Sequence, residues 1–145
     1  MKKIISIILS GLLLVACETT SSDNGVLDGM WYLTRVDTLS NGQTADFRSQ
    51  RIFWSFQGSL AQFNCSDGSG QFYMSHFSST GSNLILKDIF LYDRVNGDSM
   101  IDSNSLHEVQ AFGINSLNES FAIEKLNNAA MVLKDDTLRL TFEKY

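Results

Sequence analysis

Proline is absent from this sequence of 145 residues, and cysteine and histidine each occur only twice. Without proline, the chain cannot be collagen-like or proline-rich. Hydrophobic residues make up 43% of the chain and charged residues 19%, so it lacks the charge-rich composition of disordered proteins. Because domains most often contain about 100–150 residues, the length predicts a single folded domain.

Positive charge is also scarce. The chain has 11 Lys and Arg residues against 16 Asp and Glu residues, which gives a net charge of −5, and no basic cluster stands out. Nucleic-acid binding and electrostatic docking on anionic lipid both depend on concentrated positive charge. We therefore expect no nucleic-acid partner.

Sequence signatures of catalysis and metal binding are missing. His76 and His107 are not part of any His-x-x-x-His or Cys-x-x-Cys spacing, whereas a zinc site needs three or four ligands at defined spacings. No Gly-x-Ser-x-Gly motif is present to position a nucleophilic serine. We predict no catalytic residue, no metal and no cofactor, and we expect that the protein is not an enzyme.

Residues 1–16 have the pattern of a signal peptide. Lys2 and Lys3 precede an apolar run that is too short for the ~20 residues of a membrane-spanning helix. The following Leu14-Val15-Ala16-Cys17 resembles the lipobox of bacterial lipoproteins. This resemblance implies cleavage before Cys17 and attachment of lipid to its sulfur, so the membrane is a predicted partner through the N-terminal lipid.

Residues 17–26 are predicted to form a lipidated, flexible tether, because positions 18–25 are small and polar. Glu18 stands where some enteric lipoproteins carry an inner-membrane retention signal that begins with Asp. By that resemblance we expect the protein in the outer membrane, and its side, periplasmic or cell-surface, stays open. Lipidation of Cys17 would leave Cys65 without an intramolecular partner, and we interpret Cys65 as a small buried apolar residue.

The body from residue 27 onward alternates apolar and polar residues with a period of two, as half-buried strands do. Turn-forming residues separate about eight such segments, which predicts an all-β meander, sandwich or barrel. The predicted strands are 30–36, 52–57, 60–65, 71–77, 84–92, 121–126, 130–134 and 137–143. Residues 40–50 are predicted to be a loop.

One short helix is predicted near residue 105. Ser105 and Glu108 match a capping box, and Gly113 is placed to end a helix of about two turns. Leu106 and Phe112 have helical spacing.

Gly29-x-Trp31 opens the first predicted strand, and the segments 111–114, 121–126, 131–133 and 138–144 follow near the C-terminus. In these features the chain resembles the lipocalin-like domain of Bacteroidetes lipoproteins. The resemblance implies that residues 27–145 form an antiparallel up-and-down barrel of about eight strands. It also implies that a basic side chain, Lys144 or Arg139, closes the barrel over Trp31; Lys144 is preferred because it shares a strand face with Phe142.

Aromatic residues dominate the expected interior. The candidates for a ligand pocket are Trp54, Phe56, Phe63, Phe72 and Met74. An eight-stranded barrel is just wide enough to be filled by side chains or to hold one small ligand, so these residues either line a pocket or fill a closed core.

Two functions are consistent with these patterns. The first is an outer-membrane lipoprotein, expected to be a monomer, that binds a small hydrophobic or amphipathic molecule inside the barrel. The alternative is an envelope accessory or interaction protein with a packed core that binds a polysaccharide or protein through its outer face or loops. Thr38, Ser99 and Thr137 follow Asp and precede Leu or Met, which resembles the O-glycosylation motif of exported Bacteroidetes proteins.

Overall fold

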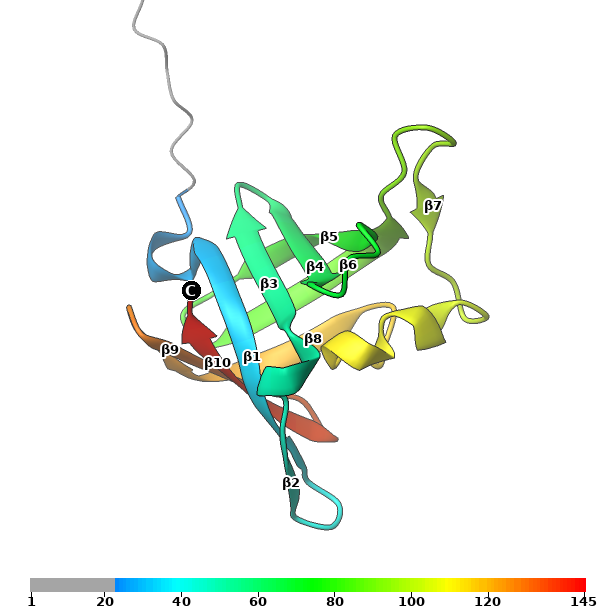
Figure 1. The fold of residues 1–145 in the computed structure, drawn as a ribbon. Coiled ribbons are helices and arrows are strands. Elements are labelled where there is room, and N and C mark those ends of the chain that lie inside the picture. The colour runs from blue at the N-terminus through cyan, green and yellow to red at the C-terminus, as the bar shows by residue number, and fades with distance from the viewer. Residues whose placement is uncertain (1–22) are drawn as a thin grey trace, which may run out of the picture.

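The computed structural model describes residues 23–145, so the predicted signal peptide and Cys17 lie outside the described residues. Antiparallel strands form a single curved sheet (Figure 1). The strands are β1 (Gly29–Thr38), β2 (Gln43–Asp46), β3 (Ile52–Gln57), β4 (Leu60–Cys65), β5 (Phe72–Ser79), β6 (Asn83–Leu91), β7 (Ser99–Met100), β8 (Glu119–Leu126), β9 (Ala130–Lys134) and β10 (Leu138–Lys144).

The sheet closes into a barrel because β1 pairs with β10, from Trp31 opposite Lys144 to Thr38 opposite Leu138. Around the barrel the strand order is β1, β3, β4, β5, β6, β8, β9 and β10. The two remaining strands lie outside this ring: β2 pairs antiparallel with the second half of β1, and β7 pairs with the end of β6. The predicted all-β, eight-stranded antiparallel barrel is therefore confirmed.

Alternation along the strands decides which side chains enter the barrel. In β3, for example, Trp54 and Phe56 are buried in the core while Ser55 between them is only partly covered. The same alternation in β10 buries Leu140 and Phe142. One face of each of the eight ring strands thus contributes to a single hydrophobic core, whereas β2 and β7 are exposed.

The prediction of a short α-helix near residue 105 is wrong. Two 3₁₀ turns, η3 (Leu106–Glu108) and η4 (Gln110–Phe112), occupy this segment. Ser105 does not cap a helix, because its hydroxyl instead accepts a hydrogen bond from the backbone N–H of Asp102 at 2.9 Å. None of the helical segments in residues 23–145 is long and apolar enough to span a membrane.

The predicted loop at 40–50 also differs, since it contains β2 and the 3₁₀ turn η2 (Arg48–Gln50). At the N-terminal side, the folded structure begins before residue 27, inside the predicted tether of residues 17–26. The side-chain amide of Asn24 donates to the carbonyl of Gly58 at 2.9 Å, and the 3₁₀ turn η1 (Gly25–Leu27) buries Leu27.

Candidate functional site

One end of the barrel is closed around Trp31. The indole N–H of Trp31 donates to the carbonyl of Leu27 at 2.8 Å, and the ammonium of Lys144 lies 4.2 Å from the centre of the Trp31 ring. Lys144 also donates to the carbonyls of Val26 and Asp28. Partial burial lowers the pKa of Lys144, although the neighbouring Asp28 carboxylate favours the charged form.

Position 29 needs glycine because of its backbone conformation and because Lys144 lies close to it. Its φ is +103°, and a β-carbon there would come within 3.2 Å of the Lys144 Nζ. The Gly-x-Trp spacing therefore leaves room for the lysine that covers the ring.

The middle of the barrel is filled by aromatic side chains. The Trp54 ring is fully buried, with its centre 4.8 Å from that of Phe63 and 5.1 Å from that of Phe142. Phe56 and Phe121 complete the surroundings of Trp54, at 6.3 and 5.8 Å. Of the two alternatives left open by the sequence, the structure thus favours a packed core at Trp54, Phe56 and Phe63.

The segment between β7 and β8 closes the opposite end of the barrel, beyond the last residues of β6. The indole N–H of Trp54 donates to the carbonyl of Phe112 at 3.2 Å, and the hydroxyl of Tyr73 donates to the Glu108 carboxylate at 3.0 Å. Burial is the larger cause that raises the pKa of Tyr73 to about 12, and the hydrogen bond to Glu108 is the second. Val109 and Ile114 of this segment, which forms a cap on the barrel, are fully buried.

Phe72 and Met74 do not belong to the interior, so the prediction that they share a pocket with Trp54 is wrong. In β5 it is Tyr73 and Ser75 that point inward, because Tyr73 pairs with the buried Phe63. Ser75 is covered completely, and its hydroxyl lies 2.8 Å from the carbonyl of Lys87, where the pairing with β6 is irregular. Phe72 and Met74, in the first half of β5, therefore point out of the barrel, whereas Phe77 further along packs against the core.

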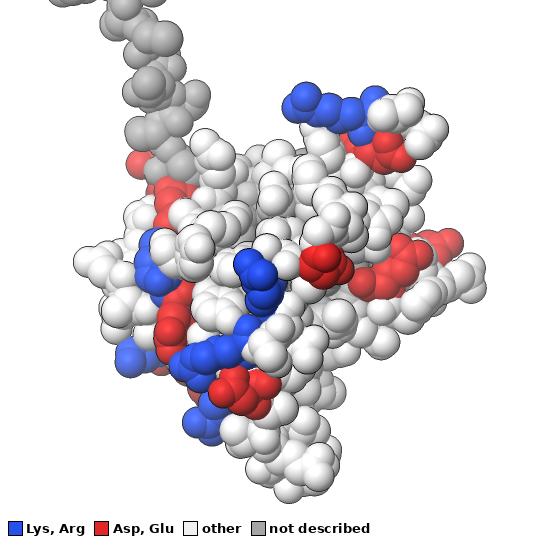
Figure 2. Space-filling view, in the orientation of Figure 1, with Lys and Arg blue, Asp and Glu red and all other residues white. Residues whose placement is uncertain are grey.

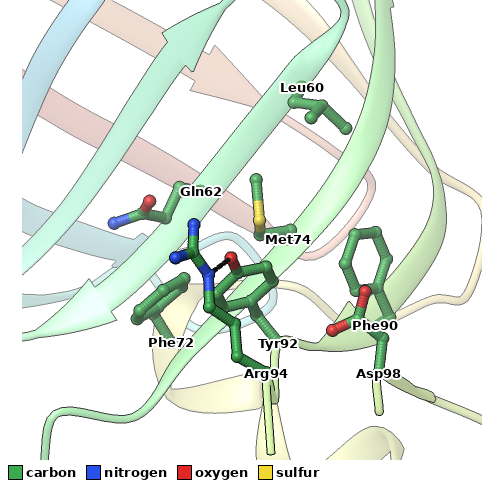
Figure 3. A pocket seen from close by; sticks show the side chains of 8 residues that line it. All are labelled: Leu60, Gln62, Phe72, Met74, Phe90, Tyr92, Arg94 and Asp98. Carbon is green, nitrogen blue, oxygen red and sulfur yellow. Dashed lines mark hydrogen bonds between the residues drawn. The ribbon is translucent and has the colours of Figure 1, made fainter.

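On this outer face, β4, β5 and β6 form the floor of a groove with a volume of about 730 Å³ (Figure 3). Met74 lies in its centre, paired with Gln62 on β4 and with Phe90 on β6. The lining residues are Leu60, Gln62, Phe72, Met74, Phe90, Tyr92, Arg94 and Asp98. A smaller hollow of about 270 Å³ shares Leu60, Gln62 and Met74 and continues toward β3.

A wall of the groove is built by the loop over residues 92–98, which projects between β6 and β7 (Figure 1). The Tyr92 ring stacks on Phe72 with a centre-to-centre distance of 4.8 Å. The Arg94 guanidinium lies over the Tyr92 ring, 5.6 Å from its centre, and donates to the Tyr92 hydroxyl (Figure 3). A stacked aromatic pair and one cation thus stand beside an apolar floor.

The projecting loop carries charged side chains of both signs, whereas the surface directly next to it carries few. In Figure 2, basic and acidic side chains are mixed over the lower left of the molecule, whereas an uncharged area lies below the charged loop and is bordered by acidic side chains. At the loop tip Val95 is 90% exposed, and on the adjacent β7 Met100 is 60% exposed. Apolar side chains exposed next to a groove are typical of binding surfaces.

The predicted O-glycosylation positions differ in exposure. Thr38 lies at the end of β1 and Ser99 at the start of β7. Thr38 is half-buried and follows a buried aspartate, Asp37, whereas Ser99 and Thr137 are exposed.

Cys65 is half-buried, and its thiol donates to the carbonyl of Gln50 at 3.0 Å. Burial raises the pKa of this thiol. Within residues 23–145, no three His, Cys, Asp or Glu side chains gather in a way that could hold a metal ion.

The groove residues Leu60, Phe90, Tyr92, Arg94 and Asp98 were not predicted as site residues. The sequence held one signal for an outer apolar surface at β5. Phe72 and Met74, which share one strand face, are more apolar than Tyr73 and Ser75 on the other face. Sequence alternation defines two faces of a strand, but it does not say which one enters the barrel.

Comparison with solved structures supports the fold. A lipocalin-like protein from Bacteroides uniformis ATCC 8492 has a TM-score of 0.61 and 21% identity, covering 83% of this chain and 100% of its own. A protein from Bacteroides eggerthii DSM 20697 has a TM-score of 0.59 and 19% identity, covering 82% and 99%. A protein from Burkholderia xenovorans, at a TM-score of 0.53 and 14% identity, covers 83% and 84%. At these identities the likeness concerns the fold alone.

A comparison with curated proteins finds no match. The lipocalin-like domain family, in contrast, matches residues 12–145, which is nearly the whole sequence. The chain belongs to the family of lipocalin-like domains.

Proposed function

We propose that this protein is a non-enzymatic lipoprotein of the outer membrane that binds a small apolar or amphipathic molecule in the groove on the outside of its barrel. The lipobox-like sequence that ends at Cys17 supports the anchor. The observation that carries the binding proposal is the contrast between the two faces of β5. Its inner face packs against a filled core, while its outer face forms an apolar groove of about 730 Å³.

The anchor can be tested in the native bacterium. We expect the wild-type protein to incorporate labelled fatty acid and to sediment with outer membranes. The Cys17→Ser variant should lose the label and leave the membrane fraction, whereas Cys65→Ser, a matched loss of a thiol, should behave as wild type. An unlabelled wild-type protein would contradict the anchor.

The binding site can be tested without detergent on a lipid-free chain of residues 18–145, because the closed barrel and its core lie within residues 24–145. The neutral fluorophore N-phenyl-1-naphthylamine should bind saturably to this chain. Met74→Gln, which puts an amide on the groove floor, should weaken binding. Phe56→Leu, a change inside the barrel, should leave binding unchanged if circular dichroism shows an intact fold. The reverse ranking of the two variants would place the ligand in the interior and refute the outer site.

Exposed apolar side chains favour a second candidate function, in which a protein or glycan of the envelope binds the loop over residues 92–98. Val95 in this loop and Met100 on the adjacent β7 are both largely exposed. A photo-crosslinking residue at position 95 in intact cells should then give one defined product that is absent when it is placed at Asn41, in the turn between β1 and β2. Identical patterns at both positions would argue against this candidate.

A further inference from the structure

The cation in the outer groove lacks an ionic partner among the described residues. Arg35, Arg48 and Arg139 each form an ion pair with a carboxylate. Within residues 23–145, the Arg94 guanidinium forms no ion pair; it donates a hydrogen bond to the Tyr92 hydroxyl and lies over the Tyr92 ring. A guanidinium has five N–H donors in a planar fork, so donors remain available for a ligand in the groove.

The two aspartates of the loop are already used to hold its backbone. The Asp93 carboxylate accepts the N–H groups of Val95 at 2.8 Å and Asn96 at 3.0 Å. The Asp98 carboxylate accepts the N–H of Asp93 at 3.0 Å. These bonds fix the loop so that it carries Arg94 over the groove, while neither carboxylate forms an ion pair with the guanidinium.

Apart from Gln62, the floor of the groove is apolar. Leu60, Met74 and Phe90 are half-buried on the floor, and the Phe72 and Tyr92 rings stand beside them (Figure 3). A ligand that fits this arrangement has an apolar body to cover the floor and one acidic group to meet the guanidinium. Carboxylate, sulfonate and phosphate groups all match the paired N–H donors of arginine.

We infer that the outer groove selects amphipathic anions: molecules with an apolar or aromatic body and one acidic group that pairs with Arg94. This inference rests on the proposed binding function and adds the chemical class of the ligand. The Arg94 side chain must then turn from the Tyr92 ring toward the acid group, a local movement of an exposed side chain.

Two fluorophores with closely related ring systems test the inference on the chain of residues 18–145. The anion 8-anilino-1-naphthalenesulfonate should bind more tightly than neutral N-phenyl-1-naphthylamine. Arg94→Gln should weaken anion binding about fivefold, the upper range for a solvent-exposed ion pair, and leave the neutral probe unaffected. Arg94→Lys should restore part of the loss. Lys125→Gln removes an exposed positive charge on β8, outside the groove, and should change neither affinity.

The outcomes distinguish a wrong ligand class from a wrong binding site. Equal binding of both probes, unchanged by Arg94→Gln, would overturn the preference for anions and leave the groove intact. Equal weakening of both probes by Arg94→Gln would show that Arg94 only shapes the loop, which also overturns the inference. If neither probe binds, or if Met74→Gln affects neither, the proposed groove itself is wrong.

Discussion

Gly113 should be one of the most sensitive positions of the barrel. It follows η4 in the cap that closes one barrel end, and its φ is +85°. A β-carbon at this position would lie 2.8 and 2.9 Å from the two terminal methyl groups of Leu140, a fully buried core residue. Gly113→Ala therefore combines an unfavourable backbone conformation with a steric clash.

The two costs can be added from general values. A left-handed conformation costs a non-glycine residue about 1–2 kcal/mol, and overpacking of a core costs about 1–3 kcal/mol. We expect Gly113→Ala to lower the free energy of unfolding by about 2–5 kcal/mol, which corresponds to a fall of roughly 10–20 °C in Tm for a domain of this size. Urea unfolding followed by circular dichroism measures this loss.

Gly97 offers a matched control. Its φ is +90°, but a β-carbon there would meet no atom within 4 Å. Gly97→Ala should therefore show only the backbone cost, about 1–2 kcal/mol. If the two variants lose the same stability, the contact between Gly113 and Leu140 does not restrict the cap, and the steric reasoning is wrong.

Three other perturbations test the contacts described above. Lys144→Met should lower the free energy of unfolding by about 1–3 kcal/mol in urea titrations, because it removes charge-assisted hydrogen bonds and the cation over Trp31; no loss would contradict a closing role. Burial raises the pKa of Glu119 above 4.5, so its folded form binds protons more readily than its unfolded form. Stability should accordingly rise as pH falls through the raised value toward 4.5, and Glu119→Gln should flatten this slope; an unchanged slope would refute the assignment. Cys65 should react more slowly with iodoacetamide at pH 8 than a cysteine in a short peptide, because burial raises its thiol pKa; an equal rate would argue against burial.

The strands were predictable because turn residues mark their ends. β3, β4 and β9 have the predicted bounds; glycine, asparagine, serine or aspartate flank β4 and β9 on both sides and follow β3. β2 was missed because all four of its residues are exposed, so no apolar alternation reveals it. β7, with two exposed residues, gave no pattern at all.

The binding groove could not be predicted from the sequence, for a physical reason. Its floor depends on pairing between strands, which brings Met74 next to Gln62 and Phe90. Hydrophobicity also misleads in β5, where the polar Ser75 is buried against a strand irregularity and the apolar Met74 faces outward. The contact between Lys144 and Trp31, in contrast, was expected from the family resemblance and from the face shared with Phe142.

Both ends of the folded chain meet at one end of the barrel. The ammonium of Lys144 bonds the carbonyl of Val26 at 3.0 Å, and the backbone N–H of Tyr145 donates to Met30 at 2.9 Å. If the chain is anchored through Cys17 as proposed, a fusion partner attached after Tyr145 would lie on the same side of the barrel as the anchor and would crowd the membrane. The turn between β1 and β2 extends away from both ends (Figure 1) and is the better position for an epitope tag.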